Sequence, residues 1–200
     1  MKNTQTFIIE YDQKIYDFSD MACQILGVDE LHKIHLRDDI HRLNRGPVAE
    51  QIEVCRSALA EGFREFAELY DAFVTEVIGP LYGGIISYQR PPSFRFHYSG
   101  RGSSAFHRDR DYGVKCGRLN LWVPLTRVWG DNSLWIESEE GAEDYTPTEL
   151  DYGQALIFDG ANLKHGSKVN TTSSTRVSFD LRFAPHSMMA PGSHLVLLVR

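Results

Sequence analysis

The pattern of apolar and polar residues divides the chain into a helical first part and a β-rich second part. Across residues 48–78 apolar side chains recur close to every 3.6 positions, with Glu, Arg and Asp between them, which is typical of an amphipathic helix. The apolar positions are Ile52, Leu59, Phe63, Phe66, Leu69, Tyr70, Phe73, Val74 and Val77. Gly79-Pro80 is expected to end this helix, and a shorter helix is predicted over residues 21–26, before Gly27.

After Gly83 the pattern changes to short β-forming runs separated by Gly, Ser, Asn and Asp. The runs are IISYQ (85–89), SFRFHYS (93–99), RLNLWVPLT (118–126), SLWIES (133–138), GQALIFDG (153–160) and STRVSFDLRFA (174–184). Short strands at this spacing favour a β-sandwich or barrel over alternating βαβ units. We therefore predict a mainly β protein with N-terminal helices (α+β), in which residues 1–82 are mainly helical support and residues 83–185 form the β core.

Composition agrees with one globular domain spanning residues 1–200. The 200 residues are 42% hydrophobic and 24% charged, which excludes wholesale disorder. With 21 Lys and Arg against 27 Asp and Glu, the net charge of −6 argues against a partner that is a nucleic acid. The composition leaves the oligomeric state open.

The chain carries no recognisable targeting signal. Its first apolar run, residues 7–9, is too short for a signal peptide, and no run approaches the length of a membrane span. Cys23, Cys55 and Cys116 are widely separated and form no C-x-x-C pair, which suits thiols in a reducing compartment. We expect a cytoplasmic protein without a membrane partner.

The chemistry concentrates in the β-rich part, where the sequence FHRDRDYG places His107 two residues before Asp109. On an extended segment these two side chains face the same side, so an imidazole and a carboxylate can meet one ion. With eight histidines in the chain, about one His-x-Asp or His-x-Glu is expected by chance, so the pair is weak evidence by itself. A structural hydrogen-bonded pair remains the alternative.

Three further residues strengthen the pattern. His165 follows the predicted strand ALIFD and can add a second imidazole, and Arg176 and Ser178 share one face of the last strong strand. An Arg fork beside a hydroxyl suits the binding of a buried carboxylate. Two imidazoles and one carboxylate on one side of a metal leave adjacent positions open, as in the facial triad of non-haem Fe(II) oxygenases.

With these motifs the sequence resembles the Fe(II)/2-oxoglutarate-dependent oxygenases of the HxD…H…RxS type, over roughly residues 85–185. Within that superfamily it is most similar to small oxygenases of antibiotic gene clusters, including the group named for streptomycin biosynthesis. RFHYSGRGSSAFHRD, NLWVPLTRVWGDNSLWIES and QALIFDGANLKHG resemble the strands and turns that form the metal site in that family. The resemblance implies a double-stranded β-helix (jelly-roll) core.

The resemblance also implies roles for individual residues. His107, Asp109 and His165 would hold Fe(II), and Arg176 and Ser178 would bind the far carboxylate of the co-substrate 2-oxoglutarate. Further contacts to the co-substrate are expected from Tyr98, Asn120 and Trp122, although aromatic residues on strands are more often part of the core. O₂ would be the second co-substrate, with hydroxylation as the default outcome and desaturation or cyclisation as variants. An Asp at position 109 disfavours halogenation, because halogenases of the family carry a small residue there.

Other side chains near these motifs have two readings each. Asp180 and Arg182 continue the inward face of Arg176, so they either approach the substrate or pair with each other. His97 is expected to point opposite Tyr98, away from the metal. The basic stretch Arg101, Arg108, Arg110, Lys115 and Arg118 favours a solvated loop over a phosphate groove, and His32, His35 and His41 favour structural or surface roles over a metal site.

The leading hypothesis is an oxygenase that acts on a small polar metabolite, such as an amino acid or amino sugar. The alternatives are a nucleic-acid-modifying or protein-modifying member of the same superfamily, and a metal-binding β-barrel without catalysis. A cupin would usually show H-x-H, which the chain lacks, and a zinc hydrolase would have no use for Arg176 and Ser178.

Overall fold

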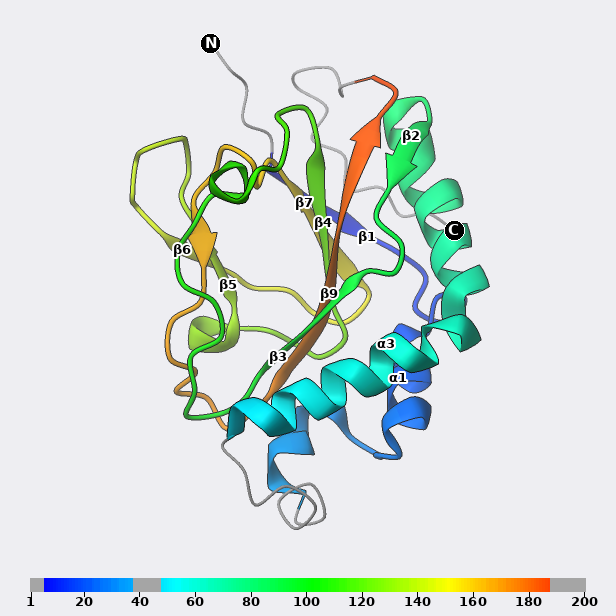
Figure 1. The fold of residues 1–200 in the computed structure, drawn as a ribbon, viewed down its shortest axis with the longest axis vertical. Coiled ribbons are helices and arrows are strands. Elements are labelled where there is room, and N and C mark those ends of the chain that lie inside the picture. The colour runs from blue at the N-terminus through cyan, green and yellow to red at the C-terminus, as the bar shows by residue number, and fades with distance from the viewer. Residues whose placement is uncertain (1–5, 38–47, 188–200) are drawn as a thin grey trace.

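Two antiparallel β-sheets and a layer of helices make up the fold (Figure 1). The structure is a computed structural model, and it describes residues 6–37 and 48–187. The helices cover one face of the larger sheet, and the smaller sheet packs against the opposite face of that sheet. The site described below lies between the two sheets.

The larger sheet has six strands. Its order is β1 (Thr6–Glu10), β7 (Gln154–Phe158), β4 (Leu119–Pro124), β9 (Arg176–Pro185) and β2 (Ile85–Tyr88), and β3 (Ser93–His97) also pairs with β9. All of these pairings are antiparallel. Strand β9 is therefore central, because it pairs with β4 on one side and with β2 and β3 on the other.

The smaller sheet consists of β6 (Thr146–Thr148), β5 (Leu134–Ile136) and β8 (His165–Gly166), in that order. A single bridge between His107 and His165 extends it by one further segment. The space between the sheets holds an apolar cluster of Trp122, Val128, Leu134, Ile136, Leu150, Leu156, Phe158 and Leu163.

The helices pack on the other face of the larger sheet. They are α1 (Phe18–Leu26), a 3₁₀ turn (Leu31–Leu36) and α3 (Val48–Ala72), which continues into a π-helical segment (Phe73–Ile78) and a 3₁₀ turn (Gly79–Tyr82). Aromatic side chains join this layer to the sheet, with the rings of Phe18 and Phe179 5.1 Å apart and edge-on. None of the helices in the described ranges is long and apolar enough to cross a membrane.

The elements depart from the sequence prediction at three places. Residues 6–10 form an edge strand against β7, whereas the prediction put residues 1–82 mainly in helical support. Strands β6 and β8 were missed because the sequences TPT and HG contain no run of β-branched or aromatic residues. Helix α1 begins at Phe18, ahead of the predicted start, where the Asp17 carboxylate accepts a hydrogen bond from the Asp20 backbone.

Candidate metal centre

His107, Asp109 and His165 come together between the two sheets. The Nε2 atom of His107 lies 3.5 Å from Oδ1 of Asp109, and Nε2 of His165 lies 3.9 Å from the same oxygen. Within residues 6–37 and 48–187 they form the one group of three or more His, Cys, Asp or Glu side chains whose ligand atoms lie close enough to hold a metal ion. Asp109 and His165 are buried, and the side chain of His107 is 22% exposed.

Backbone pairing brings the two histidines together. The backbone N–H of each histidine donates to the carbonyl of the other, at 2.9 Å in both directions, so their side chains lie directly opposite each other. The close approach depends on Gly166, because a Cβ there would lie 2.8 Å from Cα of Phe106. The backbone N–H of Asp109 donates to the carbonyl of Gly160 at 2.8 Å, which fixes the third residue against the turn after β7.

The second nitrogen of each imidazole is held by a carbonyl oxygen. Nδ1 of His107 lies 2.7 Å from the oxygen of Ala105, and Nδ1 of His165 lies 2.9 Å from the oxygen of Leu163. A carbonyl can only accept, so each Nδ1 carries the hydrogen and each neutral ring presents a lone pair at Nε2. Metal-binding histidines are characteristically oriented in this way.

The carboxylate of Asp109 is held by two donors on the larger sheet. Arg182 donates from Nε to Oδ2 at 2.7 Å and from Nη2 to Oδ1 at 2.9 Å, and Asn120 donates to Oδ2 at 2.8 Å. A carboxylate has about four lone-pair sites, so one remains, on the oxygen that faces both imidazoles. Burial alone would raise the pKa of Asp109, but its contacts with His107, Arg182 and Asn120 hold that pKa well below its ordinary value.

The three free lone pairs converge without a donor between them. The neighbouring Asp109 carboxylate raises the pKa of His107 despite partial burial, whereas burial lowers the pKa of His165. Three acceptor atoms facing one another repel unless a cation or a proton lies among them. Two neutral imidazoles and one carboxylate are a ligand set suited to a divalent transition metal.

A cavity of about 100 Å³ adjoins this centre. Its lining residues are Arg95, Ser103, Ser104, His107, Asn120, Trp122, Leu134, Phe158, His165, Arg176, Asp180 and Arg182. The larger sheet contributes polar side chains from β3, β4 and β9, together with Phe158 of β7, which is directly opposite Asn120. Leu134 of β5 lines the cavity from the smaller sheet.

Arg176 forms one buried end of the cavity without a carboxylate partner. Its residue is 2% exposed, and it donates only to the carbonyl of Asn132 at 3.0 Å and to Oγ of Ser167 at 3.3 Å. Its Nε is buried with no partner, and its guanidinium lies 5.6 Å from the centre of the Trp122 ring. Burial, followed by repulsion from Arg95, lowers the pKa of Arg176 to about 9.

The hydroxyl of Ser178 is a second buried group with no hydrogen-bond partner. Ser178 is fully buried and follows Arg176 on the same face of β9. Ser178 is not among the residues that line the cavity, whereas Arg176 is. A buried cation without a carboxylate counterpart is unfavourable, so Arg176 is suited to an anionic ligand.

Sequence comparison identifies a relative. The chain is 32% identical over 186 residues to the streptomycin biosynthesis protein StrG of Streptomyces griseus, and the match covers 92% of this chain and 86% of that protein. The chain belongs to the StrG family. No protein-family model matches this StrG-family chain.

Solved structures resemble the StrG-family chain more distantly. The nickel complex of the non-heme monooxygenase ThoJ is 19% identical, with a TM-score of 0.46, over 84% of this chain and 70% of that one. AviO1 from Streptomyces viridochromogenes Tue57 is 24% identical, with a TM-score of 0.39, over 64% of this chain and 60% of that one. Both TM-scores are below 0.5, and the fold of the chain rests on its own strand pairing.

One predicted site residue of this StrG-family chain faces the wrong side of the sheet. His97 is directly opposite Arg176 in the pairing of β3 with β9, so these two side chains share the cavity face, and Tyr98 faces the helices. The hydroxyl of Tyr98 lies 3.7 Å from Sγ of Cys55, and Tyr98 belongs to the apolar core under the helices. The expectation that Tyr98 contacts a co-substrate and His97 points away was therefore wrong about the orientation of both.

Of the remaining predicted residues of the larger sheet, all but Ser178 line the cavity. Asn120, Trp122, Arg176, Asp180 and Arg182 all line the cavity. Asp180 and Arg182 do not pair with each other, since each has a different partner on a neighbouring segment. Arg182 binds Asp109, as described above.

The partner of Asp180 is Arg95, which the sequence reasoning missed. Its Nε donates to Oδ1 of Asp180 at 2.7 Å, across the pairing of β3 with β9. Arg95 could have been recognised from its position two residues before His97, because alternate residues of a strand share a face. The prediction instead turned the face that carries Tyr98 towards the metal site.

Two other predictions can be placed. The basic stretch is only partly a solvated loop, because Arg108 forms an ion pair with the buried Glu137 at 2.9 Å. Nδ1 of His35 lies 2.7 Å from Oγ1 of Thr175, and His32 lies 3.8 Å from Glu30, so both have local partners in the fold. His41 lies outside the described residues.

Proposed function

We propose that the protein is an Fe(II)- and 2-oxoglutarate-dependent oxygenase that hydroxylates a small polar metabolite. The observation that carries this proposal is the convergence of three lone pairs, from His107, Asp109 and His165, beside a cavity with an unpaired buried Arg176. The triad fits a metal with open positions for other ligands. The cavity offers a place for an anion next to that metal.

The residues around Arg176 fit the far carboxylate of 2-oxoglutarate. The unpartnered Nε of Arg176 is a free donor on the cavity lining, as a carboxylate requires, and the unpartnered hydroxyl of Ser178 lies two residues further along the same face of β9. Trp122 lies against the guanidinium and would restrict the position of the ligand chain. Asn120 donates to Asp109 and so orients that carboxylate, and the Oδ1 atom of Asn120 has no hydrogen-bond partner.

When bound, Fe(II) and 2-oxoglutarate would supply the oxidising chemistry with O₂, and the co-substrate would leave as succinate and CO₂. The protein's part is binding and orientation. Arg182 and Asn120 keep Asp109 ionised and leave it one lone pair, so it would be a monodentate ligand. Trp122, Leu134 and Phe158 contribute the apolar part of the cavity lining.

Strand order supports a jelly-roll core for the enzyme. The run β3–β9–β4–β7 in one sheet, opposite β6–β5–β8 and the His107 segment in the other, suits eight strands wound as a double-stranded β-helix. The name of the StrG relative supports a role in specialised metabolism. We propose a cytoplasmic protein with a small, freely diffusing substrate rather than a nucleic acid or protein.

The test has a binding arm and a turnover arm. Anaerobic addition of Fe(II) and 2-oxoglutarate should produce a visible metal-to-ligand absorption band, and with O₂ and candidate amino acids or amino sugars succinate should form. Asp109→Ala should abolish both, and Arg176→Ala should chiefly weaken 2-oxoglutarate binding. Arg127→Ala is the matched control, because Arg127 is 72% exposed and pairs with the equally exposed Asp151. Absence of the band together with absence of 2-oxoglutarate consumption would refute the proposal.

A further inference from the structure

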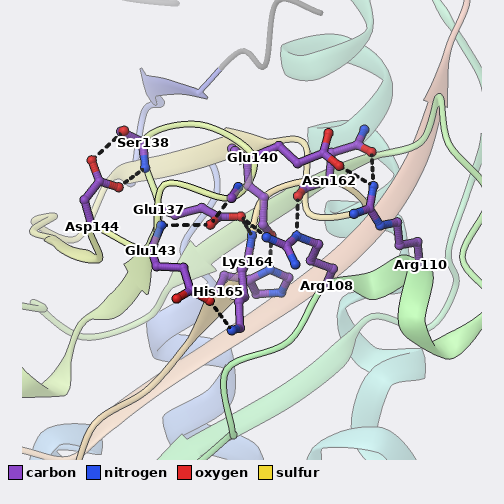
Figure 2. Close-up of polar contacts among 12 residues, drawn as sticks. Arg108, Arg110, Glu137, Ser138, Glu140, Glu143, Asp144, Asn162, Lys164 and His165 are labelled. Atoms are coloured by element: carbon purple, nitrogen blue, oxygen red, sulfur yellow. Dashed lines mark hydrogen bonds and ion pairs between the residues drawn. The ribbon is translucent and has the colours of Figure 1, made fainter.

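A buried carboxylate, Glu137, lies beside the metal centre without touching its three residues. Its side chain is fully buried, and it follows β5 directly. Figure 2 shows Glu137 among Arg108, Glu143 and Lys164. The mechanism proposed above gives this residue no role.

Glu137 contacts both chain segments that carry the triad. One segment contains Arg108, which lies between His107 and Asp109 in the chain and donates from Nη2 to Oε1 of Glu137 at 2.9 Å. The other segment contains Lys164, the residue before His165, whose backbone N–H donates to the same oxygen at 2.6 Å. One oxygen atom thus joins the two segments.

Further bonds make this connection rigid. The backbone N–H of Glu137 donates to the carbonyl of Lys164 at 3.1 Å, so Glu137 holds Lys164 through both its backbone and its side chain. Arg108 also donates from Nε to the carbonyl of Asn162 at 2.9 Å, which attaches it to the turn before His165. The second oxygen of Glu137 accepts from the backbone of Gly141 at 3.1 Å and Glu143 at 3.3 Å.

Every group that contacts the side chain of Glu137 is a hydrogen-bond donor. Burial alone would raise the pKa of Glu137, but the donors of Lys164, Glu143 and Arg108 outweigh it and lower the pKa. An ionised carboxylate, which only accepts, satisfies all four donors at once. A glutamine cannot, because its NH₂ group must face one of the two pairs of N–H donors.

We propose that Glu137 is a positioning residue that sets the separation of the His107–Asp109 segment from the His165 segment through Arg108 and Lys164. The inference rests on the proposed function, in which these segments hold a metal. A ligand set held on two separate segments binds a metal tightly only when the segments keep a fixed spacing. Groups that orient metal ligands typically contribute a factor of about 10 to 100 to metal affinity.

The experiment compares Glu137→Gln with the unsubstituted protein by calorimetric titration with Co(II) alone. The visible spectrum of the bound Co(II) is recorded as well, since it reports ligand geometry independently of turnover. Glu137→Gln should weaken Co(II) binding about 10-fold to 100-fold and alter the spectrum. Failure of the unsubstituted protein to bind Co(II) would instead refute the proposed function, so the two failures are distinguishable.

Asp144→Asn is the matched control. The carboxylate of Asp144 accepts from the backbone and hydroxyl of Ser138, at 2.8 and 2.6 Å, in the same loop, and it contacts neither segment. This variant changes the same chemical group and loop, so it should keep the Co(II) affinity within twofold of the unsubstituted protein. An equal loss of affinity in both variants would show a general effect of the loop and overturn the inference.

Arg108→Gln covers the case in which Glu137→Gln does not fold. It removes the guanidinium that links Glu137 to the His107–Asp109 segment and leaves the bond between Glu137 and Lys164 in place. Co(II) binding should weaken at least threefold. A folded variant of either kind whose Co(II) affinity stays within twofold of the unsubstituted protein overturns the inference.

Discussion

Arg176→Met should stabilise the protein and strongly weaken its binding of 2-oxoglutarate. Burial lowers the pKa of Arg176 to about 9, from an ordinary value above 12. At about 1.4 kcal/mol for each pKa unit, keeping this guanidinium charged at neutral pH costs about 5 kcal/mol of unfolding free energy. Methionine removes that charge, fills similar apolar volume against Trp122 and leaves the carbonyl of Asn132 without its donor, which costs about 2 kcal/mol. The expected net gain is about 3 kcal/mol.

The assay is urea unfolding at pH 7 without ligand, followed by thermal unfolding with and without 2-oxoglutarate and Co(II). A ligand that binds only the folded state raises the midpoint temperature. The increase that 2-oxoglutarate adds to the increase from Co(II) alone should therefore largely disappear in Arg176→Met. Arg95→Met is the matched control on the same cavity wall. It should lower the stability, because it leaves the mostly buried Asp180 without its cation.

The reasoning would be refuted if Arg176→Met lost 1 kcal/mol or more of unfolding free energy without ligand. That result would show that the guanidinium stabilises the fold and has its counterparts within the protein. A variant that gained stability and still bound 2-oxoglutarate with unchanged affinity would contradict the assignment of the ligand instead.

Three smaller predictions follow from individual side chains. Ser178→Ala should change the unfolding free energy by less than about 0.5 kcal/mol, because the hydroxyl of Ser178 has no partner. The affinity for 2-oxoglutarate, measured by titration, should fall about fivefold, and an unchanged affinity would show that Ser178 does not bind the ligand. Tyr98→Phe should leave that affinity within twofold, because Tyr98 lies in the helix-side core, and a larger loss would show that it does reach the ligand. Burial, and after it the charge of Arg176, lowers the pKa of His97 to about 4. The unfolded chain therefore protonates His97 at a higher pH than the folded protein does, so the stability falls as the pH drops from about 6.5 towards 4. Between pH 7 and 5 this loss should be about 2 kcal/mol in urea unfolding and absent in His97→Gln, and equal losses in both proteins would contradict it.

Much of the candidate site could be predicted because its motifs are local. His107 and Asp109 are two residues apart, and Arg176, Ser178, Asp180 and Arg182 alternate along one strand, so their common face follows from the period of a strand. The long helix after residue 48 was predictable because its apolar stripe repeats over many turns. Strands β6 and β8 were not, because the sequences TPT and HG contain no run of β-branched or aromatic residues. Strand β1, TFIIE, has such a run and was missed.

What the sequence determines by itself is therefore which side chains share a face and which chemical types lie near one another along the chain. The tertiary structure decides which face is turned inward and which charges become partners. Tyr98 and His97 exchanged their expected orientations because the pairing of β3 with β9 places His97 opposite Arg176. Glu137 meets Arg108 and Lys164 across 29 and 27 residues of chain. Contacts of this kind depend on the register between strands, and the period of one strand carries no information about it.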